Sequence, residues 1–131
     1  MSTPVESSSL GDAIARYRYA YLMTTNAQGA PHAVAVSAVL QDGALIVDGL
    51  GRRTRENALA RPAVGLVWPP ASPADYSLIV DGQAEVVGDR MRIVPTRAVL
   101  HRSAPSPRPK ASGACGSDCV ELGLPEEASN R

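Results

Sequence analysis

The sequence is short of aromatic residues and of lysine. It contains no Phe and one Trp, and Lys110 is its only lysine; the other positively charged side chains are Arg. A core without Phe must be built from Val, Ala, Leu and Ile. Thirteen basic residues balance thirteen acidic ones, so the formal net charge is zero. That balance argues against a nucleic-acid-binding protein, which normally carries a basic excess.

Long apolar runs are absent as well. No segment approaches the roughly 20 apolar residues of a membrane-spanning helix. The first nine residues have neither the basic start nor the apolar stretch of a signal peptide. The length of 131 residues suits one domain. We therefore expect a soluble cytoplasmic protein that does not bind nucleic acid or a membrane.

Cysteine and histidine are too few, and unsuitably spaced, for an ordinary zinc site, so no metal is expected. Cys115 and Cys119 form C-x-x-x-C, which differs from the C-x-x-C of thioredoxins. On a helix they would share a face, and in a loop they would close a small disulfide. A cytosolic location argues against a structural disulfide. We expect the pair to be peripheral.

Apolar patterning predicts one helix followed by a series of strands. The helix begins at Ser8 or Ser9 and runs to about Tyr17, with Leu10, Ile14 and Tyr17 on one face. The run from His32 to Leu40 lacks polar alternation, so both of its faces are expected to be covered. The predicted strands are Tyr19–Thr25, His32–Leu40, one from Ala44, Ala63–Trp68, Tyr76–Val87 and Met91–His101.

Turn signals recur about every ten residues and predict a small antiparallel barrel. Asp42-Gly43 is a two-residue hairpin signal. Asp81-Gly82 fits either a hairpin turn or a glycine bulge in one bent strand, and Pro95 marks an edge or a bend. Residues 8–102 would form the domain. Residues 103–131 form a Pro/Ser/Gly-rich, linker-like tail, in which Ser103–Gly113 is expected to be mobile or to wrap a partner.

The stretch after Leu45–Val47 has the features of an anion site. A turn with two glycines leads to Arg52, Arg53 and Arg55 around Thr54, which has the chemistry of a helix N-cap. A second, short helix is expected from about Thr54 to Ala60, and Arg61-Pro62 ends it, because the residue before proline is pushed out of the helical region. Free N–H groups, the helix dipole and guanidinium charges together suit a phosphate. A solvated basic turn explains the same residues equally well.

Several segments in this order resemble the pyridoxamine 5′-phosphate oxidase-like family, the split β-barrel flavin and deazaflavin proteins. The most specific are the opening from Thr24 to His32 and the R-x-N-x-x-x-x-P-x-V block from Arg55 to Val64. The resemblance covers about Leu10 to His101. It implies a mainly β fold, a six-stranded antiparallel split β-barrel with short helices, in which Tyr76–Val87 is one bent strand.

The resemblance also implies a homodimer with two flavin sites at the subunit interface. FMN is the expected cofactor, with F420 as the alternative. Its phosphate would lie at Arg52, Arg53, Thr54 and Asn57, and its ring along Val36, Ser37 and Ala38, near Asp48 and Gly49. Trp68 would either line the pocket or pack in the core, the commoner role of a lone Trp. His32 would either face the ring or be a surface or structural histidine.

The chain departs from true pyridoxamine phosphate oxidases, which are longer and carry substrate-phosphate residues near the C-terminus. Vitamin B6 oxidation is therefore not implied. Three functions stay open: a flavin- or deazaflavin-dependent oxidoreductase acting on a small molecule, a cofactor carrier without turnover, and a heme-binding split barrel. In the first, the cofactor supplies the chemistry, so no catalytic residue is assigned.

Overall fold

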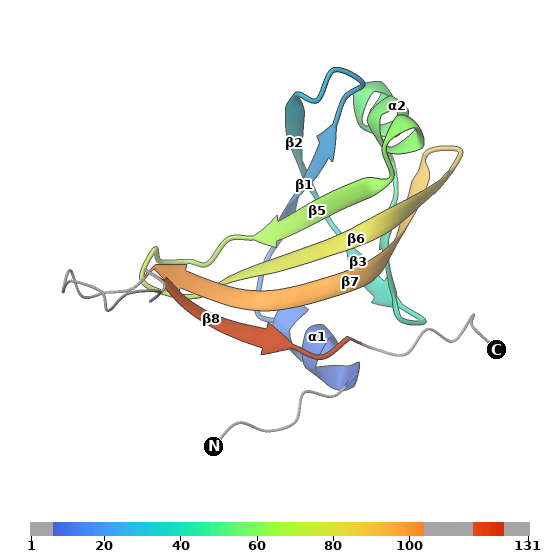
Figure 1. Ribbon diagram of the computed structural model, residues 1–131. Helices are drawn as coiled ribbons and strands as arrows, with labels where there is room; N and C mark the ends of the chain where they lie inside the picture. Colours follow the sequence, from blue (N-terminus) through green and yellow to red (C-terminus); the bar gives the residue numbers. More distant parts are fainter. Residues whose placement is uncertain (1–6, 104–116, 125–131) are drawn as a thin grey trace.

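A computed structural model describes residues 7–103 and 117–124, and shows one curved antiparallel sheet with a helix at each end (Figure 1). Helix α1 (Ser7–Ile14) lies at one end of the barrel and α2 (Arg52–Ala60) at the other. The strands are β1 (Ala20–Thr25), β2 (Pro31–Val36), β3 (Val39–Gln41), β4 (Ala44–Val47), β5 (Ala63–Trp68), β6 (Ser77–Val87), β7 (Arg90–Ser103) and β8 (Ser117–Leu122).

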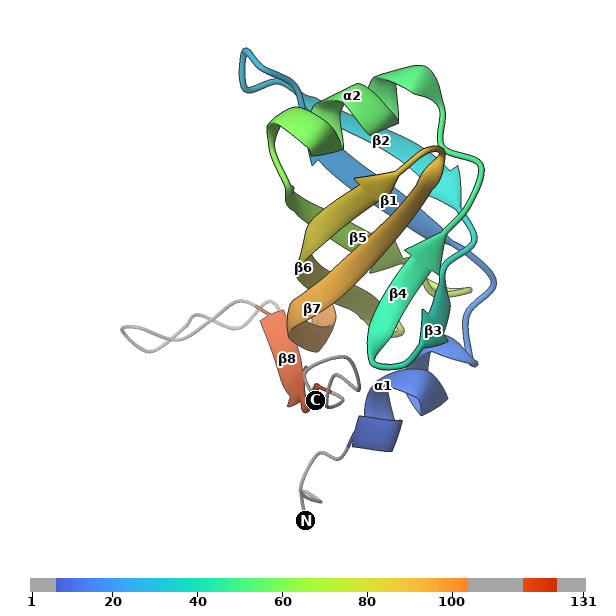
Figure 2. The same ribbon diagram turned by 90° about the vertical axis from the view of Figure 1, so that its right-hand side faces the viewer.

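The sheet is closed into a barrel by a short connection. Its strand order is β2-β1-β5-β6-β7-β4-β3, with β8 added to β7, so β2 and β3 are the two ends of the main path. Only Ser37 and Ala38 separate these two strands in the sequence. Three Cα steps span at most about 11 Å, so the sheet must curl until its edges lie together, as Figure 2 shows. No ladder joins β2 to β3 among the described residues, and the barrel is split along that seam.

The structure confirms the split-barrel class but has two more strands than the six expected. The predicted strand His32–Leu40 is two strands, because the chain leaves one edge of the sheet at Ser37 and joins the other edge at Val39. Its two faces are also not both covered within one chain. Residues facing the interior are half-buried, whereas Ala33 and Ala35 are exposed. Apolar composition alone does not reveal where a strand changes partners.

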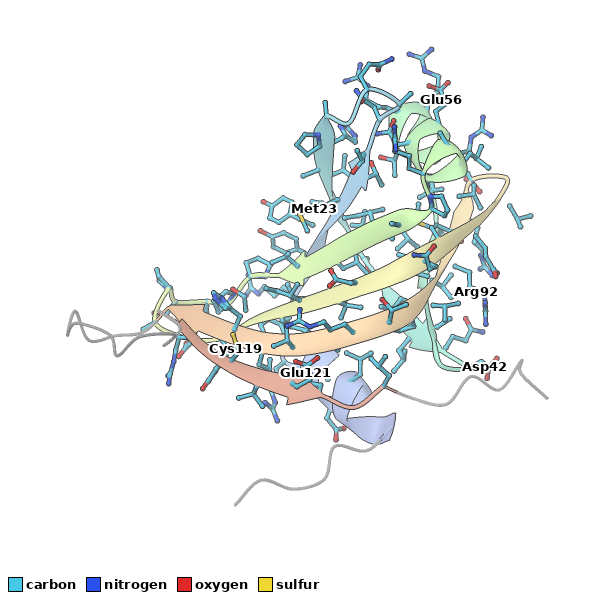
Figure 3. The ribbon with its side chains drawn as sticks, in the orientation of Figure 1. Met23, Asp42, Glu56, Arg92, Cys119 and Glu121 are labelled. Atoms are coloured by element: carbon cyan, nitrogen blue, oxygen red, sulfur yellow. The ribbon has the colours of Figure 1, made fainter. Side chains whose placement is uncertain are left out.

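The second additional strand comes from the tail. β8 pairs with β7 from Ala98 to Ser103, so the segment expected to be linker-like extends the sheet. Cys119 is exposed on this strand, opposite His101, and projects from its outer surface (Figure 3). The prediction that Ser103–Gly113 is mobile or wraps a partner concerns residues that, after Ser103, lie outside the described part of the chain, as does Cys115.

The interior of the barrel is aliphatic, as the absence of Phe requires. Strand side chains alternate between the interior and the outer face, and outside β2 most of those pointing inward are almost fully buried. Trp68 is the largest of them, at 2% exposed. Helix α1 closes one end with the predicted face: Leu10 is fully buried, and Ile14 and Tyr17 pack against the core. It stops at Ile14, three residues early, because Tyr17 N–H bonds Ile14 O in a tighter turn.

Local turn chemistry is largely as predicted. Asp42 and Gly43 both have positive φ, at 53° and 80°, and form the tight turn between β3 and β4. Arg61 is extended and ends α2 before Pro62. The start of α2 differs from the prediction: Gly51 is the N-cap, and Thr54 is a buried residue of the first turn. The helix therefore starts earlier than a threonine cap would suggest, directly after the turn at Gly49.

Gly82 bends β6 where the sheet curls. The register between β6 and β7 shifts between Asp81 and Gly82, and Gly82 lies opposite Pro95, so the bulge interpretation is confirmed over the hairpin. A Cβ atom at Gly82 would lie 2.6 Å from Ile93 Cγ2 and 2.7 Å from Val94 O. The absence of a side chain therefore lets β7 pass close over β6 at the bend.

We predict that Gly82→Ala destabilises the protein by about 1–3 kcal/mol, because the backbone must shift to admit the methyl group. The measurement is the free energy of unfolding in urea at fixed protein concentration. Gly11→Ala is the matched control. Its Cβ would meet Leu40 Cδ2 at an ordinary 3.4 Å, so stability should be unchanged or slightly higher. Equal stability of the Gly82→Ala variant and the wild type would contradict the close approach.

Candidate functional site

A cavity of about 630 Å³ lies between β2 and the segment that joins β4 to α2. This size is typical of small-molecule sites. One wall is β2, whose His32, Val34 and Val36 face the barrel interior. The opposite wall is the turn after β4 and the first turn of α2. The full lining is His32, Val34, Ala35, Val36, Ser37, Val47, Asp48, Gly49, Leu50, Gly51, Arg52, Arg53 and Thr54.

The turn from Asp48 to Gly51 is held by the hairpin between β6 and β7. Gly49 has φ of 74°, a conformation that favours glycine. Leu50 N–H donates to Asp89 O at 2.9 Å, and Arg90 Nε donates to Asp48 Oδ1 at 2.7 Å. The hydrogen bond and charge of Asp48 raise the pKa of Arg90 above its ordinary value. The single carboxylate in the cavity wall is therefore neutralised by a neighbouring cation.

The start of α2 presents unsatisfied donors and positive charge to the cavity. The helix's hydrogen-bond ladder begins with Arg55 N–H to Gly51 O at 3.0 Å, and Gly51 provides no side-chain cap. The N–H groups of Arg52, Arg53 and Thr54 thus precede the ladder. Arg52 and Arg53 are exposed, line the cavity and make no ion pair or hydrogen bond within the described ranges. These groups together favour an anionic ligand.

The C-terminal half of helix α2 and the residue after it are hydrogen-bonded to the β1–β2 hairpin. Asn57 Nδ2 donates to Thr24 Oγ1 at 3.0 Å, and both side chains are buried. Arg61 donates from Nε to Asn26 O and from Nη2 to Ala27 O, each at 2.8 Å. The hairpin that carries β2 and the helix that carries the arginines are therefore held as one unit, which fixes both walls of the cavity.

The structure brings most of the expected site residues together. Val36, Ser37, Asp48, Gly49, Arg52, Arg53 and Thr54 all line the cavity. Ala38, Asn57 and Trp68 do not. Ala38 lies in the link to β3 and packs against the core, and Trp68 is buried inside the barrel. The Asn57 amide is directed to Thr24 beneath the helix, where it positions α2.

Some lining residues were not expected from the sequence. His32, for which the sequence left open a place facing the ring or a surface or structural role, lies in the cavity wall. The register between β1 and β2 indicates its direction: His32 lies opposite the buried Thr24, so it points into the barrel. Val34 joins it by the same alternation, opposite Leu22. Only the pairing of β2 with β1 reveals which alternate residues face inward.

The described residues offer no group of three or more metal-binding side chains. In the same part of the chain, every helix is too short or too polar to cross a membrane. The cavity itself is built from cationic side chains, backbone donors and small residues, a combination that suits a small anionic molecule.

The family to which this architecture belongs is evident from sequence comparison. A family model described as pyridoxamine 5′-phosphate oxidase matches residues 10–111. An uncharacterized protein of Mycobacterium bovis and one of Mycobacterium tuberculosis are each 40% identical over 137 residues, covering 92% of this chain and 96% of theirs. The chain belongs to the pyridoxamine 5′-phosphate oxidase family.

Solved structures share the fold at low sequence identity. A putative pyridoxamine 5′-phosphate oxidase from Listeria innocua has a TM-score of 0.60 at 15% identity, covering 72% of this chain and 96% of that one. A heme-binding protein from Mycobacterium smegmatis has a TM-score of 0.60 at 16% identity, and the match covers 92% of this chain and 60% of that one. An F420 reductase has a TM-score of 0.55 at 21% identity, and the match covers 73% of this chain and 98% of that one. Split barrels described as FMN-binding, from Nostoc punctiforme, and FAD-binding, from Mesorhizobium loti, also match. These likenesses establish the fold alone.

We predict that Asn57→Ala and Thr24→Val each destabilise the protein by about 1–3 kcal/mol, because each leaves a buried polar partner unsatisfied. In a double-mutant cycle the two changes should show a coupling energy of about 1 kcal/mol, measured by urea unfolding. Additive effects would show that the hydrogen bond does not fasten α2 to β1.

Proposed function

We propose that this protein binds FMN, with the phosphate at the start of α2, and acts as a flavin-dependent oxidoreductase on a small molecule. The observation that supports this most directly is the uncapped first turn of α2, where Arg52 and Arg53 line a cavity without any anionic partner in the described residues. A phosphate carries about two negative charges near neutral pH. Two guanidinium groups and the N–H groups of residues 52–54 would offset that charge.

The flavin ring would lie along β2. Val36 and Ser37 line the cavity, and Ala38 follows directly where β2 ends. Side chains this small allow a planar ring to approach the strand, and Asp48 and Gly49 would flank it from the opposite wall. The ion pair between Asp48 and Arg90 removes the repulsion that a lone carboxylate would exert on the phosphate.

The residues present fit such a cofactor. Flavin, when bound, supplies hydride transfer, and the protein contributes position and electrostatics. The inward-facing strand residues would hold the ring against the barrel and exclude water from one face. His32 also lines this wall, and its place opposite Thr24 directs it to the cavity.

F420 is the alternative ligand, and heme is a third, because split barrels with these ligands share the fold. FMN is favoured by the compactness of the basic group. Arg52 and Arg53 occupy one helical turn, whereas the long acidic tail of F420 would require a wider basic groove. The next residue that lines this cavity and carries a charge is Asp48, which is acidic.

We predict that Arg53→Ala weakens FMN binding about ten- to a hundredfold, because one charge-assisted hydrogen bond contributes about 1.5–3 kcal/mol. The measurement is titration of apo protein with FMN and, separately, with F420. Arg55→Ala is the matched control: it removes the same charge from an exposed site on the same helix, outside the cavity lining. Its FMN affinity should match the wild type.

Two results would count against the assignment. If the wild type binds neither ligand, the oxidoreductase proposal falls and a heme-binding or cofactor-free role replaces it. If FMN binds and both arginine variants behave alike, the phosphate lies elsewhere on the barrel.

A homodimer is also proposed, on the basis of an apolar outer face. The side chains of β1 that point away from the core include Tyr21, which is 41% exposed, and Met23, which projects from the sheet in Figure 3. Their cross-strand neighbours continue the face without a charge over three strands; they are Ala33, Ala35, Gly65 and Val67. A second copy of the chain would cover this face.

We predict that wild type has about twice the 13.7 kDa chain mass by light scattering at micromolar concentration, and that Met23→Arg shifts the mass toward the monomer. A buried arginine without a partner is costly at an interface. Val87→Arg is the control, because Val87 is 77% exposed at the end of β6, away from this face. A monomeric wild type would refute the dimer.

A further inference from the structure

A second and larger cavity, of about 790 Å³, lies between the connection from α1 to β1 and the loop from β5 to β6. It shares no lining residue with the cavity beside α2. Its walls are aromatic and apolar, with Tyr17, Tyr19 and Tyr76 beside Pro69 and Pro70. Three of the four tyrosines of the chain thus line one cavity, and none of these three side chains is fully buried.

The walls of this second cavity are held in place by contacts across the fold. Tyr17 OH donates to the carbonyl oxygen of Tyr76 at 2.8 Å, which joins the two segments that form the walls. The guanidinium carbon of Arg102, on β7, lies 4.5 Å from the centroid of the Tyr76 ring. Pro69 and Pro70 restrict the backbone beside them. Rings fixed in this way form a preorganised surface, which reduces the entropy lost on binding.

The charges of this cavity favour a single anionic group. Arg16 and Arg18 both line it, are exposed, and have no ion pair or hydrogen bond in the part of the chain that the structure describes. Asp75 is the one acidic residue in the lining, so the cavity has one net positive charge. Burial raises the pKa of the Tyr17 hydroxyl, and Asp75 adds to that rise while Arg16 opposes it. Tyr17 therefore remains a neutral hydrogen-bond donor at physiological pH.

We propose that this second cavity binds a planar aromatic carboxylate. The ring would stack on the tyrosine and proline walls, which favour flat apolar ligands. The carboxylate would accept hydrogen bonds from Arg16 and Arg18, whose planar guanidinium groups match its geometry. This assignment does not depend on the proposed FMN site, because different residues form the two cavities.

The test is calorimetric titration of the full-length protein with 2-naphthoate, a two-ring aromatic monoanion. Arg16→Gln and Arg18→Gln should each weaken binding by about tenfold, the loss expected for one charge-assisted hydrogen bond. The neutral analogue 2-naphthamide should bind at least tenfold more weakly than 2-naphthoate, and acetate should not bind detectably. Arg55→Gln removes the same charge from an exposed residue that lines neither cavity, and its affinity should equal the wild type.

Separate measurements distinguish this site from the FMN site. Circular dichroism should show that every variant keeps the wild-type fold, and Arg16→Gln and Arg18→Gln should keep wild-type affinity for FMN. Saturating FMN should leave 2-naphthoate affinity unchanged. The proposal is overturned if 2-naphthoate does not bind at millimolar concentration, if the amide binds equally well, or if FMN displaces it. It is also overturned if Arg55→Gln weakens binding as much as the two cavity variants.

Discussion

The two-residue connection between β2 and β3 is the constraint on which the rest of this structure depends. It joins the two ends of the main sheet, so the intervening strands must curl until those ends meet. The curl requires a sharp bend in the longest strands, and Gly82 provides it opposite Pro95, where β7 passes too close for a side chain. Beyond that bend β7 changes its outer partner from β4 to β8. The short link thus accounts for the closure of the sheet, and Gly82 allows the bend that closure needs.

The same closure creates the candidate site. Because no ladder crosses the seam between β2 and β3 in the described residues, the inner face of β2 is left open toward the turn after β4. That turn is held by Asp48 and Arg90, and the helix after it by Asn57 and Arg61, so neither wall depends on a ligand for its position. The cationic side chains and N–H groups at the start of α2 are thus held by contacts within the fold, an arrangement that reduces the cost of binding a ligand. The fold itself is shared by proteins with different cofactors, so the ligand is decided by the side chains at this seam.

Local chemistry was sufficient for much of the fold and for part of the site. At Asp81-Gly82 the neighbouring residues fitted either a hairpin or a bulge, and only the family resemblance favoured the bent strand that the structure shows. By contrast, the turn at Asp42-Gly43, the helix end at Arg61 and the strand Ala63–Trp68 were each recognisable from a few neighbouring residues. Arg52 and Arg53 were recognisable for the same reason, since a glycine turn followed by arginines at a helix start concentrates positive charge whatever surrounds it. Each of these features depends on backbone preferences or charges within one turn of chain, which the sequence states directly.

Tertiary structure alone decided which partner each of these local elements meets. The apolar run is interrupted at Ser37 because its first part pairs at one edge of the sheet, as β2, and its last part at the other edge, as β3. Asn57 faces Thr24, 33 residues away, rather than the cavity beside its own helix. His32 points inward because β2 pairs with β1 in one of two possible registers, and a shift by one residue would have turned it to the surface. Periodicity and spacing do not indicate the strand partners or the register, because the free energy that determines both comes from contacts between residues far apart in the chain.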